Sequence, residues 1–391
     1  MQILNYYFDA NFYITDNKSE YEKYSMIIEG KQMISYIVAM DNSYALMSNF
    51  IGFLTPILTI DDEVIIVSDG CNNYSTLEYI KHLVKSDFRF QLIELKEKCG
   101  FSKANNIGVN ASKYENLIFI NTDIFPTYDC IPNMINMLNQ SENIAAVQPL
   151  LLYPQNGLVQ STGHVFSKVK SGQLFAMRNC NDPLIHISAP RQALTMALCA
   201  VKKSIFYKMN GFNEEYYNSH EGMELTLKMT IFGYTCMYCA DAIAYHCSGL
   251  VRTKVPFDIS RQRAYFYQQW TNYISNDLEI YLSQQINSDM ASERYIVYNI
   301  SSSTDWKRIL ETLKINYTEE ILLQERFAPS INLYDCISFT SLYYPVPYLF
   351  LCNSFTQISS NYNWIKNRNN PKDIIMDLNG NVLRLISLIG E

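Results

Sequence analysis

The sequence lacks long apolar runs and long basic runs. No window approaches eighteen uncharged apolar residues, so no membrane-spanning helix is predicted. The first twenty residues have neither a basic segment nor the apolar core of a secretory signal, which predicts a cytoplasmic protein. Net charge is -7, and no Lys/Arg cluster is long enough to follow a phosphate backbone, which argues against nucleic acid as the main partner. Internal repeats and low-complexity linkers are also absent from the sequence.

The chain has ten cysteines, but they do not form a disulfide pattern. They are scattered, and most lie within apolar segments, which is typical of reduced, buried thiols. Cys236 and Cys239 have CxxC spacing. Because no second pair of ligands lies nearby, we interpret this segment as a plain strand rather than a zinc or redox site.

Strand and helix patterns alternate along the first two thirds of the chain. This βαβ rhythm predicts an α/β fold with a mostly parallel sheet flanked by helices. The predicted strands are Met33–Met40, Val64–Ser68, Phe90–Leu95, Leu117–Ile120 and Ala145–Leu152. The predicted helices are a first one capped by Asn42 or Ser43, Ser75–Val84, one containing Asn105, and Cys130–Leu138.

Acidic residues follow three of these strands, at the sheet edge where ligands bind in parallel sheets. They are Asp41, Asp69 and Asp123. The segment GFSKANNIG, a helix start with two asparagines and close-packing glycines, could bring backbone amides to a diphosphate, and the carboxylate of Asp123 could hold a divalent cation against it. The pattern suggests a nucleotide-sugar site.

Each of these residues also has a structural explanation. Asp69 could be a turn residue before a glycine, and Asp123 could cap the following turn. Asn105 could cap or fill its helix, and His246 could be a satisfied structural histidine. The order of these residues along a βαβ chain favours functional roles for them over the structural explanations.

Several ordered motifs resemble one known family. They are SYIVAMDNS, EVIIVSDGC, GFSKANNIG, FINTDIFP, PLLLYPQNGLVQSTG, MNGFNEEY and YHCSG. Between about Ser35 and Ser248 the chain resembles inverting glycosyltransferases of the GT-A fold, family 2, especially the bacterial rhamnosyl- and galactofuranosyl-transferase-like branch. The resemblance implies a Rossmann-like GT-A domain and a UDP- or dTDP-linked sugar donor.

The resemblance also implies roles for individual residues. Asp69 would contact the nucleotide base, and Asp123 and His246 would bind Mg or Mn, which stabilises the departing diphosphate. The implied donor-binding residues are Ala39, Met40, Asp41, Asp69, Asn105, Asn121 and Asp123.

The catalytic base departs from the family pattern. Relatives carry an acidic pair at a helix start, where one carboxylate takes the proton from the incoming hydroxyl. Here Glu221 aligns with the first acid, but Gly222 stands at the position of the usual catalytic Asp. Glu221 and Glu224 lie three apart on a predicted helix and face the same side, so either is a candidate base. Alternatively, both are first-turn acids favoured by the helix dipole.

We expect four regions: an N-terminal extension (1–32), the GT-A domain (33–250), a helical segment (251–290) and a small C-terminal α/β domain (291–391). The segment RQRAYFYQQWTNYISNDLEIYLSQQI is predicted to form one long helix. Tyr216 and Tyr217, near the acids, are candidates to touch a sugar acceptor.

The resulting hypothesis is a transferase that moves a hexosyl or deoxyhexosyl unit to a glycan or lipid-linked glycan. The second kind of acceptor would require peripheral contact with the inner face of a membrane, and a homo-oligomer is compatible with the sequence. Two rivals differ in class. One is a nucleotide-sugar-binding or scaffold protein without the base. The other is a sugar nucleotidyltransferase, which would need a Gly-rich loop with a basic residue that AMDNSYALM does not offer.

Overall fold

The structure is a computed structural model. It describes residues 32–40, 42–166, 171–176, 178, 180–181, 183–247, 259–277, 295–299, 301, 303, 305–322, 347–356 and 370–384. The chain divides into two compact units, one formed by residues 1–157 and 188–273 and the other by residues 158–187 and 274–391. The four regions expected from the sequence remain predictions. Asp41 and nearly all of the predicted N-terminal extension lie outside the described residues.

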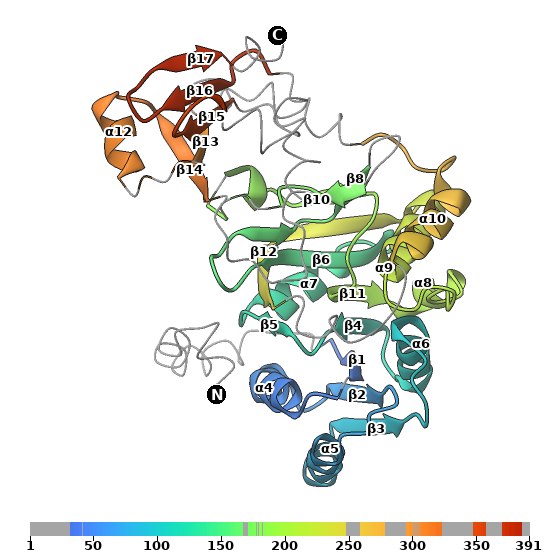
Figure 1. The fold of residues 1–391 in the computed structure, drawn as a ribbon. Coiled ribbons are helices and arrows are strands. Elements are labelled where there is room, and N and C mark those ends of the chain that lie inside the picture. The colour runs from blue at the N-terminus through green and yellow to red at the C-terminus, as the bar shows by residue number, and fades with distance from the viewer. Residues whose placement is uncertain are drawn as a thin grey trace. The chain divides into compact units, whose positions relative to one another are not determined.

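The larger unit is built on one sheet with the strand order β10-β12-β6-β11-β4-β1-β2-β3, and β5 pairs with β12 (Figure 1). Its strands are β1 (Ile34–Met40), β2 (Glu63–Ser68), β3 (Phe90–Glu94), β4 (Asn116–Ile120), β5 (Ile124–Pro126), β6 (Ile144–Leu152), β10 (Ala189–Arg191), β11 (Leu198–Lys202) and β12 (Thr235–His246). Strands β1 to β4 are mutually parallel, and β12 is parallel to β6. Strand β11 is antiparallel to both β4 and β6. The predicted mostly parallel sheet is confirmed.

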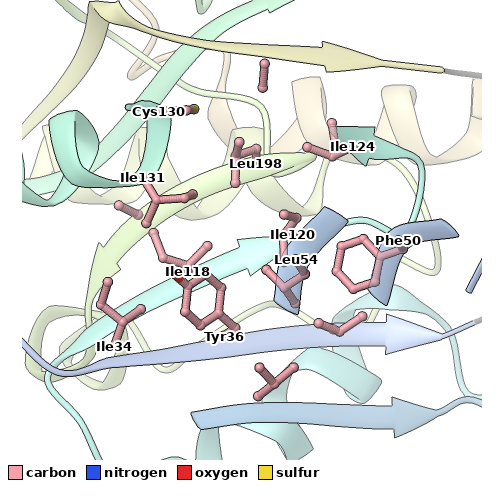
Figure 2. Close-up of a cluster of buried hydrophobic side chains, with 14 of the residues drawn as sticks. Ile34, Tyr36, Phe50, Leu54, Ile118, Ile120, Ile124, Cys130, Ile131 and Leu198 are labelled. Carbon is pink, nitrogen blue, oxygen red and sulfur yellow. The ribbon is translucent and has the colours of Figure 1, made fainter. Parts of the chain in front are cut away.

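Helices cover both faces of this sheet. They are α4 (Tyr44–Leu54), α5 (Tyr74–Ser86), α6 (Phe101–Ala111), α7 (Cys130–Leu138), α8 (Lys203–Lys208) and α9 (Glu221–Ile231), and α10 (Ile259–Trp270) follows. Buried side chains of α4, α5 and α7 form one core cluster with the sheet, part of which Figure 2 shows. Those of α6, α8 and α9 form a second cluster.

Alternation along the strands explains these two cores, because successive strand residues point to opposite faces. In β1, Tyr36 and Val38 belong to the first cluster and Ile37 to the second. A Cβ at Gly108 of α6 would lie 2.7 Å from Cγ2 of Ile37. This glycine therefore lets α6 pack close to β1.

The smaller unit contains a second sheet with the order β14-β13-β15-β16-β17. Its elements are β13 (Tyr295–Asn299), α12 (Trp306–Thr312), β14 (Tyr317–Leu322), β15 (Tyr348–Cys352), β16 (Ile374–Asp377) and β17 (Val382–Arg384). Strands β13 to β16 pair in parallel, and β17 is antiparallel. The predicted small C-terminal α/β unit is confirmed. This unit also holds the short elements β7 (Val159–Ser161), β8 (His164–Phe166), β9 (Ser171–Gln173) and η2 (Pro183–His186).

The predicted long aromatic helix is wrong in its length. Helix α10 ends at Trp270, and residues 271–277 continue without helix. The residues that follow include Thr271, Asn272, Asn276 and Asp277, all of low helix propensity. Within the described parts of the chain, no helix is long and apolar enough to cross a membrane.

Candidate functional site

The candidate site lies at the carboxyl edge of the parallel strands in the larger unit. Asp69 directly follows β2 and Asn121 directly follows β4, and both strands are parallel neighbours of β1. Met40 ends β1, but its side chain is 1% exposed and belongs to the core. Its carbonyl accepts a hydrogen bond from Asp69 N at 3.3 Å. Any donor contact at Ala39 and Met40 would therefore involve mainly the backbone.

Asp69 uses both carboxylate oxygens within the protein. Oδ1 accepts a hydrogen bond from Cys99 N at 2.6 Å, and Oδ2 accepts one from Gly100 N at 3.0 Å. Gly70 has φ +65°, and a Cβ there would lie 2.5 Å from Lys98 N. The Asp69–Gly70 turn thus fixes the loop before α6. Carboxylate oxygens can accept more than one bond each, so contact with a ligand remains chemically available to Asp69.

Asp123 and His246 come together although they lie far apart in the sequence. Strands β5 and β12 pair with Ile124 opposite His246, and Cys247 N donates to the Asp123 carbonyl at 2.9 Å. His246 Nε2 lies 3.4 Å from Asp123 Oδ1. Asp123 is 4% exposed, and its Oδ1 is buried without a hydrogen bond.

This pair fits one side of a divalent-cation site. Two ligand atoms about 2.1 Å from one ion and at right angles to each other are roughly 3 Å apart, close to the observed separation. A buried carboxylate oxygen without a hydrogen bond is costly unless a ligand satisfies it. Among the described residues, no group of three or more His, Cys, Asp or Glu is placed to hold a metal ion. The remaining ligands would have to come from substrate and water.

The two asparagines of α6 are held by protein contacts. Asn105 is 2% exposed, and its Nδ2 donates to the Phe101 carbonyl one turn earlier at 2.8 Å. Asn106 bonds both backbone groups of Phe212. The expected donor contact of Asn105 therefore gains no support from the geometry. In the GFSKANNIG segment, expected to approach a diphosphate, the amide of Gly100 already donates to Asp69, as does the amide of the preceding Cys99.

Glu221 and Glu224 lie in the first turn of α9, as predicted, and both are largely buried. Glu224 is tied into the structure: its Oε1 accepts from Asn213 Nδ2 at 3.3 Å, and its Oε2 lies 3.7 Å from Lys228 Nζ. Lys228 Nζ also donates to the Met209 carbonyl at 3.0 Å. Glu221 is the more exposed of the two acids, at 9%.

Gly222 packs directly against Met196, in the segment before β11. A Cβ at position 222 would lie 2.6 Å from Met196 Cβ and 3.1 Å from Met196 N. Contacts this short do not occur between real Cβ atoms, so the backbone would have to move. This structure has no room at position 222 for an aspartate side chain.

Tyr216 is fully buried and cannot touch an acceptor in this conformation. Its ring packs against Tyr265 at 5.3 Å between centroids. Burial, and then the nearby carboxylate of Glu224, raise the pKa of Tyr216 far above its ordinary value, with smaller contributions from Tyr265 and Glu221. The phenol is therefore neutral.

Sequence reasoning missed several residues around the site. Asn213 binds Glu224, Ser102 binds the loop before α9, and Met196 fills the space beside Gly222. These contacts join distant segments and leave no local sequence signal. Cys236 and Cys239 are buried and lie in β12, which confirms the predicted strand.

One curated relative is the uncharacterized protein y4gI of Sinorhizobium fredii, 25% identical over 230 residues. The match covers 56% of this chain and 25% of the relative, so the chain spans about a quarter of that relative's length.

Solved structures with similar folds include GalNAc-T7 with UDP, GalNAc and Mn²⁺, at a TM-score of 0.53 and 12% identity, covering 82% of this chain and 59% of that chain. This likeness confirms the fold class. The mannosyltransferase PcManGT from Pyrobaculum calidifontis, in complex with GDP-Man and Mn²⁺, has a TM-score of 0.43 at 12% identity over 68% of this chain and 70% of that chain. TarS from S. aureus, in complex with UDP-GlcNAc, has a TM-score of 0.43 at 14% identity over 66% of this chain and 68% of that chain.

The family comparison covers the part of the chain from α4 to the segment before β11. That range includes Asp69, the whole of α6, and Asp123. Residues 52–196 match the model described as Glycosyl transferase family 2.

Proposed function

We propose that this protein is a divalent-cation-dependent glycosyltransferase that moves a sugar from a nucleotide-sugar donor to a hydroxyl group. The observation that carries the proposal is the Asp123–His246 pair, with one buried carboxylate oxygen lacking a hydrogen bond, at the carboxyl edge of the sheet. The family match over residues 52–196 supports the same reaction class. Asn121 and Asp69 lie at the same edge as candidate donor contacts.

In this proposal, Asp123 and His246 would hold Mg²⁺ or Mn²⁺, and the bound cation would supply positive charge to offset that of the departing nucleoside diphosphate. Glu221 accepts the proton of the incoming hydroxyl, whose oxygen bonds to the anomeric carbon as the bond from that carbon to the phosphate oxygen breaks. Attack opposite the leaving group inverts the anomeric centre. Glu221 is preferred over Glu224, because it aligns with the first acid of the family's pair and is the more exposed of the two.

The finer assignments belong to this proposal as well. The donor is UDP- or dTDP-linked, and the sugar is a hexose or deoxyhexose of the kind moved by the rhamnosyl- and galactofuranosyl-transferase-like branch. The acceptor is a glycan or a lipid-linked glycan in the synthesis of surface polysaccharide or oligosaccharide. A lipid-linked acceptor would bring the protein to the inner face of the membrane.

Titration calorimetry of UDP and dTDP with Mn²⁺ tests the proposed binding of the nucleotide and the metal ion. Asp123→Asn should weaken Mn²⁺-dependent binding at least tenfold, because the anionic metal ligand is lost. Asp129→Asn is a matched control, since Asp129 is an exposed acid in the following turn. Equal affinity in Asp123→Asn and the control would contradict the metal role.

Turnover, measured with a nucleotide sugar identified by screening, tests whether Glu221 acts as the general base. Glu221→Gln should lose at least a hundredfold in turnover and keep its donor affinity, since general-base catalysis contributes roughly 10²–10⁴-fold. Glu224→Gln should lower thermal stability through the lost Lys228 pair. Full activity in Glu221→Gln would remove the base role from this residue.

A second candidate function is nucleotide-sugar binding without transfer. The close packing of Gly222 on Met196 favours it, because no acid can occupy position 222 in this backbone. Donor binding without transfer or donor hydrolysis, across a broad acceptor screen, would support this candidate over the transferase.

A further inference from the structure

The start of α6 is bonded to a loop more than one hundred residues later in the chain. Asn106 Nδ2 donates to the Phe212 carbonyl at 2.9 Å, and Asn106 Oδ1 accepts from Phe212 N at 2.9 Å. The same Nδ2 lies 3.1 Å from Glu214 Oε1. One amide side chain thus satisfies both backbone groups of a loop residue, as a neighbouring β-strand would.

Two more hydrogen bonds extend this contact along the loop. Ser102 is 1% exposed, and its Oγ donates to the Tyr216 carbonyl at 2.6 Å. Phe101 N donates to the Tyr217 carbonyl at 2.8 Å. The first two turns of α6 therefore hold both ends of residues 212–217, which we call the bridging loop.

Glycines allow this close approach. A Cβ at Gly100 would lie 2.7 Å from the Tyr217 carbonyl oxygen, and one at Gly211 would lie 2.8 Å from Asn106 Oδ1. Both glycines also have positive φ, at +90° and +66°. A side chain at either position would push the bridging loop away from α6.

The other side of the bridging loop contacts the acids of α9. Asn213 Nδ2 donates to Glu224 Oε1 at 3.3 Å, and Glu224 shares the first turn of α9 with Glu221. Glu224 N in turn donates to the His220 carbonyl at 2.8 Å. The bridging loop is thus bonded to the first turn of α9 through Asn213.

The GFSKANNIG segment is therefore linked in two directions. Toward β2, the amides of Cys99 and Gly100 donate to the Asp69 carboxylate. Toward α9, Ser102 and Asn106 hold the bridging loop. An Asn106 side chain turned toward a ligand would leave both backbone groups of Phe212 without these partners.

We propose that Ser102 and Asn106 are positioning residues, which hold the bridging loop and thereby orient the Glu221 carboxylate toward the acceptor. On this assignment the Asn-rich start of α6 serves the acceptor half of the site instead of binding the diphosphate. The assignment rests on the proposed function, because the role of Glu221 belongs to it. The hydrogen bonds that carry it do not depend on that function.

The test combines amide hydrogen exchange, UDP binding with Mn²⁺, and turnover in Asn106→Ala, Ser102→Ala and Ser102→Thr. Exchange at residues 212–217 should become at least tenfold faster in both alanine variants, while UDP affinity stays within twofold. The turnover number should fall at least tenfold with the donor KM unchanged. Ser102→Thr, which keeps the hydroxyl, should restore most of the loss.

Asn110→Ala is the matched control, because Asn110 is an exposed asparagine of the same helix whose Oδ1 accepts from Tyr207 Oη at 3.3 Å and which, among the described residues, makes no hydrogen bond to residues 212–217. It should leave all three measurements unchanged. Unaltered exchange at 212–217 in Asn106→Ala, or a loss of UDP affinity as large as the loss of turnover, overturns the proposal. If the wild-type protein turns over no donor, the proposed function fails, and the exchange and UDP measurements still decide whether α6 holds the loop or binds the nucleotide.

Discussion

Gly222 gives the sharpest test of how the acceptor side of the site is packed. In most exposed helix positions, replacing glycine by alanine stabilises the fold by about 0.5–1 kcal/mol, because the unfolded chain loses conformational freedom. At Gly222 the added Cβ would meet Met196 Cβ at 2.6 Å. Gly222→Ala should therefore have the opposite sign.

Overpacking a tight core costs about 1–3 kcal/mol. The upper part of that range is about 3 kcal/mol, and the usual gain from replacing glycine by alanine in a helix is about 1 kcal/mol. We therefore expect Gly222→Ala to destabilise the protein by about 2 kcal/mol. Gly52→Ala is the matched control: Gly52 lies in α4, and its Cβ would meet nothing within 4 Å. It should stabilise by about 0.5–1 kcal/mol.

The partner of the clash can be identified by a double-mutant cycle. The atoms nearest to the added Cβ are Met196 Cβ, N and Cα, so shortening the methionine beyond Cβ does not remove the contact. Met196→Ala combined with Gly222→Ala should show little relief. Met196→Gly combined with Gly222→Ala should show a favourable coupling of about 1 kcal/mol or more.

Urea unfolding followed by circular dichroism measures these changes, with each transition fitted separately because the chain has two units. The reasoning is refuted if Gly222→Ala is as stable as Gly52→Ala. It is also refuted if Met196→Ala relieves the clash as fully as Met196→Gly.

Two pKa shifts lead to further predictions. Hydrogen bonds from Arg89 lower the pKa of Asp87, so this pair stabilises the fold above the unfolded pKa of the carboxyl and the effect is lost as pH falls through the lower folded pKa. Asp87→Asn should cost about 0.5–1 kcal/mol at pH 7, and this cost should disappear as pH falls through the lowered folded pKa; a deficit that is independent of pH would contradict this. Burial and then Asp69 raise the pKa of Cys99 to about 12. Asp69→Asn should therefore speed iodoacetamide labelling of Cys99 relative to Cys71 at pH 8, as read by peptide mass spectrometry, and an unchanged ratio would count against it.

Local signals predicted most of the larger unit correctly. Ser43 caps α4 by accepting from Leu46 N at 3.3 Å, and the predicted Cys130–Leu138 helix has those bounds in the structure. These features depend on residues within one turn of one another, so sequence alone contains them. The end of α10 at Trp270 was missed, because the aromatic pattern continues after the helix has stopped.

The side-chain partners at the site could not be predicted in the same way. Asn105 and Asn106 are neighbours of one residue type, yet one bonds its own helix and the other bonds a loop 106 residues away. That difference is set by which face of α6 meets the bridging loop. No feature within GFSKANNIG specifies that face.

The contact between Asp123 and His246 could not be predicted from local sequence either. Each residue was identified from its own motif, and their contact depends on β5 pairing with the last residues of β12. Residues 240–242 interrupt the register of β12 against β6 between Cys239 and Ile243. Beyond this irregularity β12 continues along β6 and pairs with β5, which places His246 opposite Ile124 and beside Asp123.

Gly222 has two explanations that lead to different experiments. In the sequence, Gly222 stands where related enzymes have a catalytic Asp, so placing Asp at this position should restore a base. From the structure it is a position without space, because Met196 backbone and Cβ atoms lie where a side chain would begin. Gly222→Asp alone should therefore lose stability without gaining turnover. The proton-accepting role then depends on Glu221, and a protein inactive in every acceptor screen would mean that this packing replaced catalysis with binding.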